Sequence, residues 1–162
     1  MDESVERSLA KWPGVPAVFG WLGLDRRGNW LLKNPASGAR ERIGNAALNA
    51  FIARNYAHDD LGRWYFQNGP QRVYVSLAYT PLVARLDEGR YSDQCGRLFD
   101  AAASYLDDEG SVLLAGYGGV ALLDDRDLGE FVAQAGDALD TMQRIARGEV
   151  AERFAFVAEP RP

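Results

Sequence analysis

His58 is the only histidine in the chain, so any imidazole-based catalysis would have to use it. It follows a predicted helix end and precedes Asp59 and Asp60, whose carboxylates are the usual partners of a catalytic imidazole. General acid–base chemistry also needs a concave, desolvated pair of groups, which sequence spacing does not identify. We therefore expect a surface or capping role for His58. A small hydrolase or isomerase that uses carboxylates with His58 is the alternative function.

Carboxylates gather in three short clusters. The clusters are Asp59/Asp60, Asp107/Asp108/Glu109 and Asp124/Asp125/Asp127. None has the alternating oxygen ligands and central glycine of an EF-hand loop. Turn and helix-capping roles account for all three, so we expect no metal and no cofactor.

Residues 116–121, Gly-Tyr-Gly-Gly-Val-Ala, match the loose dinucleotide fingerprint G-x-G-x-x-A. That fingerprint requires a helix to begin inside the glycines, so that its N-terminus meets the pyrophosphate. Here Val120 to Leu123 reads as a strand and the next helix begins only at Asp125. We therefore predict a connection between two strands, and no nucleotide site.

The best candidate for binding is an aromatic hairpin over residues 59–79. Alternation places Trp64 and Phe66 on one face of its first strand, and Tyr65 on the other. Aromatic side chains with neighbouring Arg, Gln and Asn are typical of small-molecule pockets and of interface hot spots. The alternative is that Trp64, Phe66 and Val73 face the core, while Gln67 and Arg72 pair across the turn. The predicted ligand- or partner-binding residues are Tyr65, Gln67, Asn68, Gln71, Arg72 and Tyr74.

Residues that cap helices or form turns predict the helices and strands that position these residues. Asn45 caps a helix that runs to about Tyr56, and Pro13-Gly14 ends a helical turn over residues 2–11. Strands are expected at 15–24, 30–33, 64–67, 73–79, 82–86, 104–106, 112–114, 120–123 and 154–158, with Asn68-Gly69 in the turn of the hairpin. Further helices are expected at about 93–99 and from Asp125 to about Arg147, where Gly148 would cap the second.

The second part of the chain repeats the first at an offset of roughly 80 residues. Residues 24–32 can be laid over 106–114 with five identities in nine positions, and residues 45–53 over 125–133. We therefore predict an α+β fold of two tandem similar halves, each an antiparallel sheet packed with one main helix. The expected domains are residues 1–86, which contain the hairpin, and 87–162.

Composition limits the class of partner. The formal net charge of −5 disfavours nucleic acid, and no apolar run is long enough to cross a bilayer. The single cysteine, Cys95, excludes an internal disulfide and fits a cytoplasmic location, and we expect it to be structural. The expected partners are an unknown small molecule or protein, without nucleic acid or membrane, and a homo-oligomer is an alternative.

Four motifs together resemble a known family. They are Asp-x-x-Gly-x-Trp from Asp25, Asn-x-x-Leu-x-x-Phe from Asn45, Asp-x-x-Gly-x-Trp-Tyr from Asp59, and Val-Tyr-Val-x-Leu from Val73. In this order they are similar to an uncharacterised proteobacterial family with a duplicated domain, labelled DUF1285. The likeness is closest over Phe19 to Leu86 and looser over Leu106 to Phe131. It implies a repeated α+β arrangement and a regulatory or signalling role, with no established catalytic residue.

Taken together, these observations predict a non-enzymatic cytoplasmic binding or regulatory module, with the hairpin and its flanking loops as the contact surface. The hydrolase or isomerase and a structural, oligomer-forming subunit are the alternatives. The residues identify no ligand and no reaction.

Overall fold

A computed structural model describes residues 1–162, which separate into two compact units. The first unit contains Met1–Asp25, Asn29–Ala78 and Ala155–Pro162. The second contains Arg26–Gly28 and Tyr79–Phe154. This division differs from the expected boundary after Leu86, because residues 79–86 cluster with the second unit and residues 155–162 with the first.

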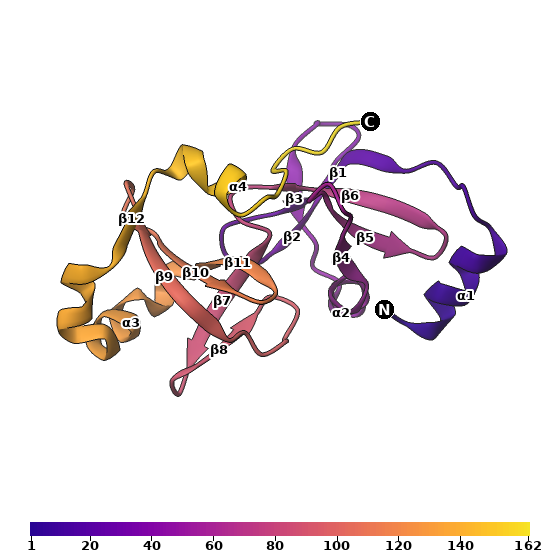
Figure 1. The fold of residues 1–162 in the computed structure, drawn as a ribbon. Helices are drawn as coiled ribbons and strands as arrows, with labels where there is room; N and C mark the ends of the chain where they lie inside the picture. The colour runs from indigo at the N-terminus through magenta and orange to yellow at the C-terminus, as the bar shows by residue number, and fades with distance from the viewer. The chain divides into compact units, whose positions relative to one another are not determined.

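The first unit is built on a six-stranded sheet in the order β3-β2-β1-β6-β5-β4 (Figure 1). Its helices are α1 (Glu3–Lys11) and α2 (Ala46–Arg54). Its strands are β1 (Val18–Leu24), β2 (Trp30–Lys33), β3 (Arg40–Arg42), β4 (Tyr56–His58), β5 (Trp64–Asn68) and β6 (Gln71–Leu77). The pairing of β1 with β6 is parallel, so the sheet is mixed and not purely antiparallel as predicted.

Local chemistry explains the predicted elements of this unit. The Asn45 side chain accepts a hydrogen bond from the Leu48 N–H at 3.0 Å, which begins α2 as expected. Phe51 of α2 packs edge-on against Phe66 of β5, with ring centroids 5.3 Å apart. In the hairpin Asn68 pairs with Gln71, so Gly69 and Pro70 form the connection, and Gly69 supplies the positive φ of 55°.

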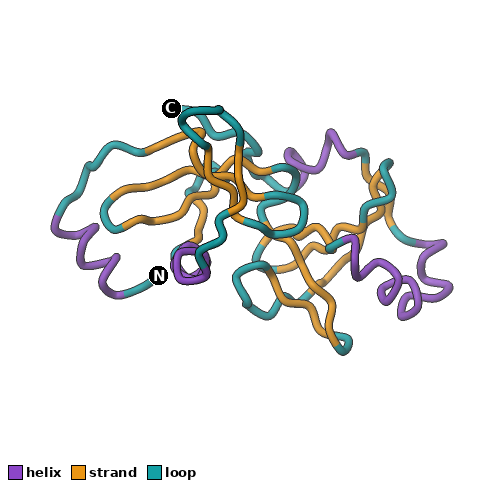
Figure 2. Tube along the Cα trace, turned by 180° about the vertical axis from the view of Figure 1, so that it is seen from behind, coloured by secondary structure: helices purple, strands orange, loops and turns teal.

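The second unit has its own six-stranded sheet, in the order β12-β9-β10-β11-β7-β8. The strands are β7 (Leu82–Asp87), β8 (Arg90–Asp93), β9 (Ala101–Asp107), β10 (Val112–Gly116), β11 (Gly119–Leu123) and β12 (Gln143–Ile145). The helices are α3 (Leu128–Ala135) and α4 (Val150–Arg153), with 3-10 segments at Asp125–Asp127, Gly136–Thr141 and Arg147–Glu149. Within each unit the strands form the centre (Figure 2).

The fold is α+β with two similar halves, as the repeat predicted. In each half a three-stranded antiparallel meander, β1-β2-β3 or β9-β10-β11, is followed by the main helix, α2 or α3. A later strand then pairs in parallel with the first strand of the meander: β6 with β1, and β12 with β9. The duplication therefore extends from sequence to strand pairing.

Four Asp-x-x-Gly turns shape the hairpin ends. They begin at Asp25, Asp59, Asp93 and Asp107. In each turn the aspartate side chain accepts the backbone N–H of the residue four positions later, at 2.7–3.0 Å, and the glycine has φ between 72° and 83°. The turns at Asp25, Asp59 and Asp107 were predicted from the sequence. The fourth, at Asp93, replaces the predicted helix over residues 93–99, so that prediction was wrong.

Two further predictions need correction. The helix expected to reach Arg147 ends at Ala135, because Gly136 has φ 50° and ψ −129°, and Gly148 lies inside a 3-10 segment instead of capping a helix. Residues 154–158 form no regular strand, but Val157 makes an isolated parallel bridge to Arg63. The prediction of a strand connection at 116–121 was correct, since β10 and β11 meet there in an antiparallel pair.

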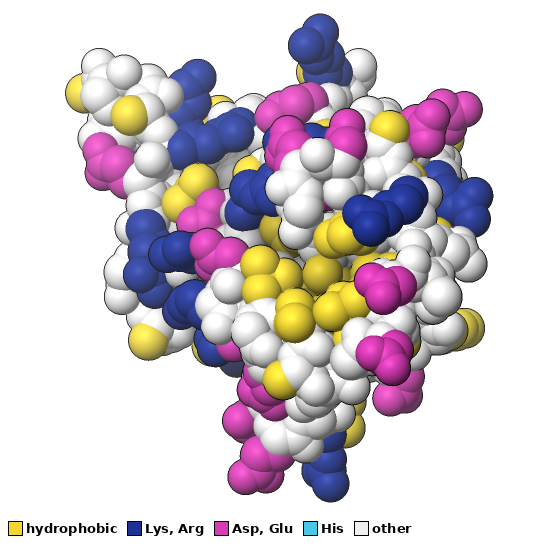
Figure 3. Space-filling view, turned by 90° about the vertical axis from the view of Figure 1, so that its left-hand side faces the viewer, with side chains coloured by type: hydrophobic (Ala, Val, Ile, Leu, Met, Phe, Trp, Pro, Cys, Tyr) yellow, Lys and Arg dark blue, Asp and Glu magenta, His cyan; other side chains and the backbone are white.

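Side chains of both charges cover the surface shown in Figure 3, around a central group of apolar side chains. None of the helices has both the length and the apolar character that crossing a bilayer requires.

Candidate ligand-binding site

The structure buries half of the predicted hairpin site. Tyr65, Gln67 and Tyr74 are 6%, 0% and 3% exposed. Gln71 and Arg72 are half-buried, and Asn68 is exposed. Their burial favours a packing role for the first three, and the predicted binding role of the six stays a prediction.

Three of the predicted hairpin residues, Tyr65, Arg72 and Tyr74, come together in one cluster. Tyr65 and Tyr74 are register partners with ring centroids 5.8 Å apart, and the Arg72 guanidinium lies 4.4 Å above the Tyr65 ring. Phe19 stacks on Tyr74 at 4.6 Å. The Tyr74 hydroxyl donates to the Asp59 carboxylate at 2.9 Å, which fixes the ring against the turn.

The His58 ring is exposed and lies beside Trp64, with centroids 4.9 Å apart. Its Nδ1 is 3.1 Å from the Asp59 carbonyl oxygen, while the Asp59 carboxylate is occupied by Arg63 and Tyr74. The pKa of Asp59 is lowered. Burial alone would raise it, but hydrogen bonds from Arg63, Tyr74 and the Leu61 N–H to the carboxylate outweigh the effect of burial. This carboxylate therefore stays ionised in an ion pair and is not directed at the imidazole.

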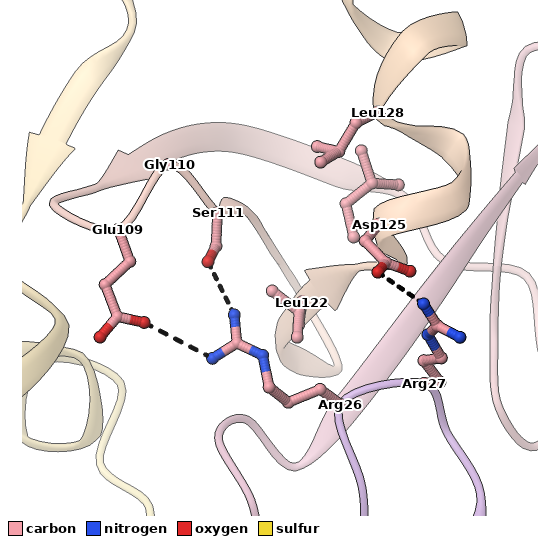
Figure 4. A pocket seen from close by; sticks show the side chains of 9 residues that line it. Arg26, Arg27, Glu109, Gly110, Ser111, Leu122, Asp125 and Leu128 are labelled. Carbon is pink, nitrogen blue, oxygen red and sulfur yellow. Dashed lines mark hydrogen bonds and ion pairs between the residues drawn. The ribbon is translucent and has the colours of Figure 1, made fainter.

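The second unit holds a cavity of about 380 Å³ that combines charged and apolar walls (Figure 4). This volume lies in the range of small-molecule sites. Its lining residues are Arg26, Arg27, Glu109, Gly110, Ser111, Leu122, Leu123, Asp125 and Leu128.

One wall is formed by Arg26 and the turn that begins at Asp107. The Arg26 guanidinium donates to the Ser111 hydroxyl at 2.8 Å, whereas its nearest contact to the Glu109 carboxylate is 3.8 Å. The same Glu109 oxygen is hydrogen-bonded tightly by Arg147. Arg26 is therefore only loosely paired, because its carboxylate partner is already engaged by another arginine.

Buried groups hold this wall in place. The Arg26 and Arg147 guanidinium groups each lie 5.0 Å from the centroid of the Tyr79 ring. Tyr79 is buried, and its hydroxyl donates to Asp107 at 2.8 Å. Burial first, and then the hydrogen bond and negative charge of Asp107, raise the pKa of Tyr79, so it remains a neutral hydrogen-bond donor at physiological pH.

The opposite wall has a tight ion pair and the floor is apolar. Arg27 contacts the Asp125 carboxylate at 2.8 Å, and both side chains are more than half exposed. Leu122 lies between the two charged walls in Figure 4, and Leu123 and Leu128 complete the apolar lining. A ligand here would meet charge at two sides and hydrocarbon between them.

The sequence predicts turn and capping roles for the clusters that contain Glu109 and Asp125, and it does not connect these carboxylates with Arg26 or Arg27. One signal was present: in the repeat, Arg26-Arg27 occupies the positions of Asp108-Glu109, so equivalent turn positions carry opposite charges. Only the tertiary structure shows that the oppositely charged turn residues Arg26 and Glu109 lie near each other.

The other carboxylate clusters are used locally. Asp107 accepts N–H groups of its own turn, and Asp124 and Asp127 bind Arg126 and Arg85 respectively. A second cavity, of about 410 Å³, is lined by Gly89, Arg90, Tyr91, Leu98, Phe99, Asp100 and Ala101. It has no ion pair across it, and we regard the first cavity as the candidate site.

Two solved structures are similar to this chain. A DUF1285 family protein from Silicibacter pomeroyi DSS-3 is 16% identical, and the match covers 77% of this chain and 74% of that one with a TM-score of 0.55. A DUF1285 family protein from Shewanella baltica OS155 is 18% identical, with coverage of 70% and 91% and a TM-score of 0.49. The first of these two matches confirms the expected similarity to DUF1285 at the level of the fold. No curated protein matches the chain.

The sequence itself matches a family model over residues 1–161, which is nearly its whole length. The model is named DUF2944 and carries the description "Protein of unknown function (DUF2946)". The chain therefore belongs to this family of proteins of unknown function.

Proposed function

We propose that the protein is a non-enzymatic binding module, and that the cavity of the second unit binds a small carboxylate with an aliphatic body. The observation that carries the proposal is the loosely paired Arg26 beside an apolar floor of leucines. This combination matches an amphipathic ligand, in which one end is charged and the rest is hydrocarbon.

Arg26 is the anchor for the carboxylate. Its guanidinium is 3.8 Å from Glu109, longer than a hydrogen bond, so a ligand carboxylate can approach without breaking a close pair. The planar guanidinium fork suits a carboxylate geometrically. Because Ser111 and the Tyr79 ring hold the Arg26 side chain, little of its rotamer entropy remains to be lost on binding.

The leucines and Asp125 determine which chemical groups the rest of the ligand can carry. Leu122, Leu123 and Leu128 offer hydrocarbon to an aliphatic chain, and Asp125 is a partner for an ammonium group if the ligand carries one. Both carboxylates at this site are held in ion pairs, Asp125 by Arg27 and Glu109 by Arg147, which favours binding over proton transfer.

Isothermal titration with four probes tests the proposal: isocaproate, leucine, leucinol and acetate. We expect isocaproate and leucine to bind, since both carry a carboxylate and the aliphatic body. Leucinol lacks the carboxylate and acetate lacks the body, so both should bind at least about tenfold more weakly.

Variants assign the contacts. Arg26→Gln should weaken isocaproate binding by about tenfold, since a charge-assisted hydrogen bond is lost. Arg7→Gln, which removes an exposed arginine from α1, is the matched control and should leave affinity unchanged. Asp125→Asn should affect leucine but not isocaproate. The proposal fails if no probe binds, or if Arg26→Gln keeps the affinity while its melting temperature shows it is folded.

A further inference from the structure

One face of the sheet in the first unit carries a row of cations with few carboxylate partners. In the β2–β3 pairing Lys33 lies opposite Arg40, and Leu31 lies opposite Arg42. The neighbouring pairing places Gly23 opposite Leu31. Because directly opposite residues share a face, Lys33, Arg40 and Arg42 project from the same side of the sheet.

The same face continues through β1 and β6. Gly23 pairs with Ser76, and alternation places Tyr74 and Arg72 on the side of Ser76. Alternation along β1 also places Trp21 on the side of Gly23. Because Leu22 pairs with Leu32, the next position along the strand places Trp21 opposite Lys33. We call Trp21, Lys33, Arg40, Arg42 and Arg72 the basic face.

Few carboxylates balance these cations. Lys33 and Arg42 are exposed and make no ion pair, and Arg72 is held by the Tyr65 ring instead of by a charge. Lys33 and Arg40 are like charges directly across a strand pair, an arrangement that costs stability unless an anion lies between them. The face is thus strongly positive in a protein whose net charge is −5.

The fold prepares Arg40 to receive a carboxylate. Its side chain lies flat across Gly23, where a Cβ would approach the Arg40 Cδ to 3.3 Å, and it donates to the Ser76 hydroxyl at 2.6 Å. Glu159, from the C-terminal segment of the same unit, lies 3.9 Å from Arg40. One carboxylate of the same unit therefore already lies beside Arg40.

An apolar contact is available beside the cations. The Trp21 side chain is 43% exposed, although it lies within a sheet. Exposed tryptophan flanked by arginine is typical of protein-binding hot spots. The net charge of the whole molecule repels a long polyanion such as nucleic acid, whereas a short acidic segment feels mainly the local charge within a Debye length.

From these observations we infer that the basic face docks an acidic, extended polypeptide segment of a partner protein. The carboxylates of the segment pair with Lys33, Arg40 and Arg42, and an apolar side chain of the segment packs on Trp21. This surface is independent of the cavity proposed above, so either proposal can fail without the other.

Fluorescence anisotropy with labelled peptides tests the inference on the full chain. The probes are an oligo-glutamate peptide, the same peptide with one phenylalanine, and an oligothymidylate of equal charge. We expect both peptides to bind at low salt, the phenylalanine peptide more tightly, and the oligothymidylate more weakly than either. Tighter binding of the oligothymidylate would overturn the inference in favour of a nucleic-acid surface.

Matched variants separate docking from bulk electrostatics. Lys33→Gln/Arg42→Gln should weaken peptide binding by about fivefold, since two ion pairs are lost. Arg7→Gln/Lys11→Gln removes the same charge from α1 and should change binding by less than about twofold. Equal effects of the two double variants, or no peptide binding at all, would overturn the inference and leave the cations as protection of an edge strand. Trp21→Ser should remove only the advantage of the phenylalanine peptide.

Discussion

Asp124 is a fully buried carboxylate whose charge the second unit keeps by direct pairing. It accepts two hydrogen bonds from the Arg126 side chain, at 2.8 and 2.6 Å, and one from the Arg126 N–H. Arg85 lies 3.9 Å away. Burial acts to raise the pKa of Asp124, but the hydrogen bonds and charges of Arg126 and Arg85 outweigh it and lower the pKa to about 2.

This pKa predicts acid sensitivity in a defined window. The ordinary pKa of the group is 3.8, so between about pH 4 and pH 2 the unfolded chain binds the proton that the folded chain rejects. The stability contributed by Asp124 is therefore complete above this window and is lost as the pH falls through it. Thermal denaturation against pH measures the loss.

Asp124→Asn should be less stable at neutral pH and show a shallower decline below pH 4. Asp137→Asn, an exposed residue of the second unit, provides the matched control and should follow the natural chain. The assignment is wrong if Asp124→Asn declines as steeply as the natural protein.

At the scale of elements, the Asp-x-x-Gly turns share one geometry but sit in different surroundings. An ideal Cβ at Gly62 would lie 2.1 Å from the Ala155 carbonyl oxygen, inside the first unit. A Cβ at Gly110 would meet nothing within 4 Å. The positive φ requires glycine at both positions, yet only Gly62 also allows a close backbone approach.

We therefore predict that Gly62→Ala costs far more than Gly110→Ala. The second substitution carries only the left-handed strain of about 1–2 kcal/mol. The first adds a backbone clash and should displace residues 155–157 or unfold the unit. Chemical denaturation of both variants measures the difference, and equal free energies of unfolding would contradict this account.

Local signals explain why the turns, the α2 cap and most strands could be predicted. An aspartate that bonds its own turn, or an asparagine that caps the next helix, needs no information from distant residues. The fourth turn, Asp93-Gln94-Cys95-Gly96, was overlooked because Ala101 to Ala103 and Leu98 suggested helix. There β pairing of residues 101–107 with β10 overrides the local propensity.

The remaining misses depend on long-range structure. The parallel partners β1–β6 and β9–β12 are far apart in sequence, and no local pattern distinguishes them from antiparallel ones. The cavity unites Arg26 with Glu109 and Arg27 with Asp125 across more than 80 residues. Alternation correctly separated Tyr65 from Trp64, but it could not show that the Tyr65 ring is also buried.

At the scale of the whole molecule, the first unit is assembled from separated stretches of chain. Residues 155–162 contribute to it through the Val157 N–H, which donates to the Gly62 carbonyl at 2.9 Å, and through the Ala158 carbonyl, which accepts from the Leu77 N–H at 2.8 Å. Phe156 is buried, 7% exposed. A fragment that ends at Leu86 therefore lacks part of its own unit.

Phe156→Ala should loosen the first unit selectively. Truncating a buried phenylalanine costs about 3–5 kcal/mol, so amides of β5 and β6 should exchange with solvent faster. Amides of β9 and β10 should be much less affected. Hydrogen exchange followed by mass spectrometry gives both values, with Arg161→Ala, an exposed neighbour, as the control. Uniform acceleration across both sheets would show that the units unfold as one.

The return of residues 155–162 to the first unit also has a consequence for synthesis. Residues 79–154 are synthesised before this segment. While they are translated, the first unit is incomplete, because the Gly62 carbonyl and the Leu77 N–H have not yet met their partners in residues 157–158. The second unit also uses Arg26–Gly28, made early, but receives the rest of its chain in one continuous run. The first unit is therefore begun before the second and completed after it.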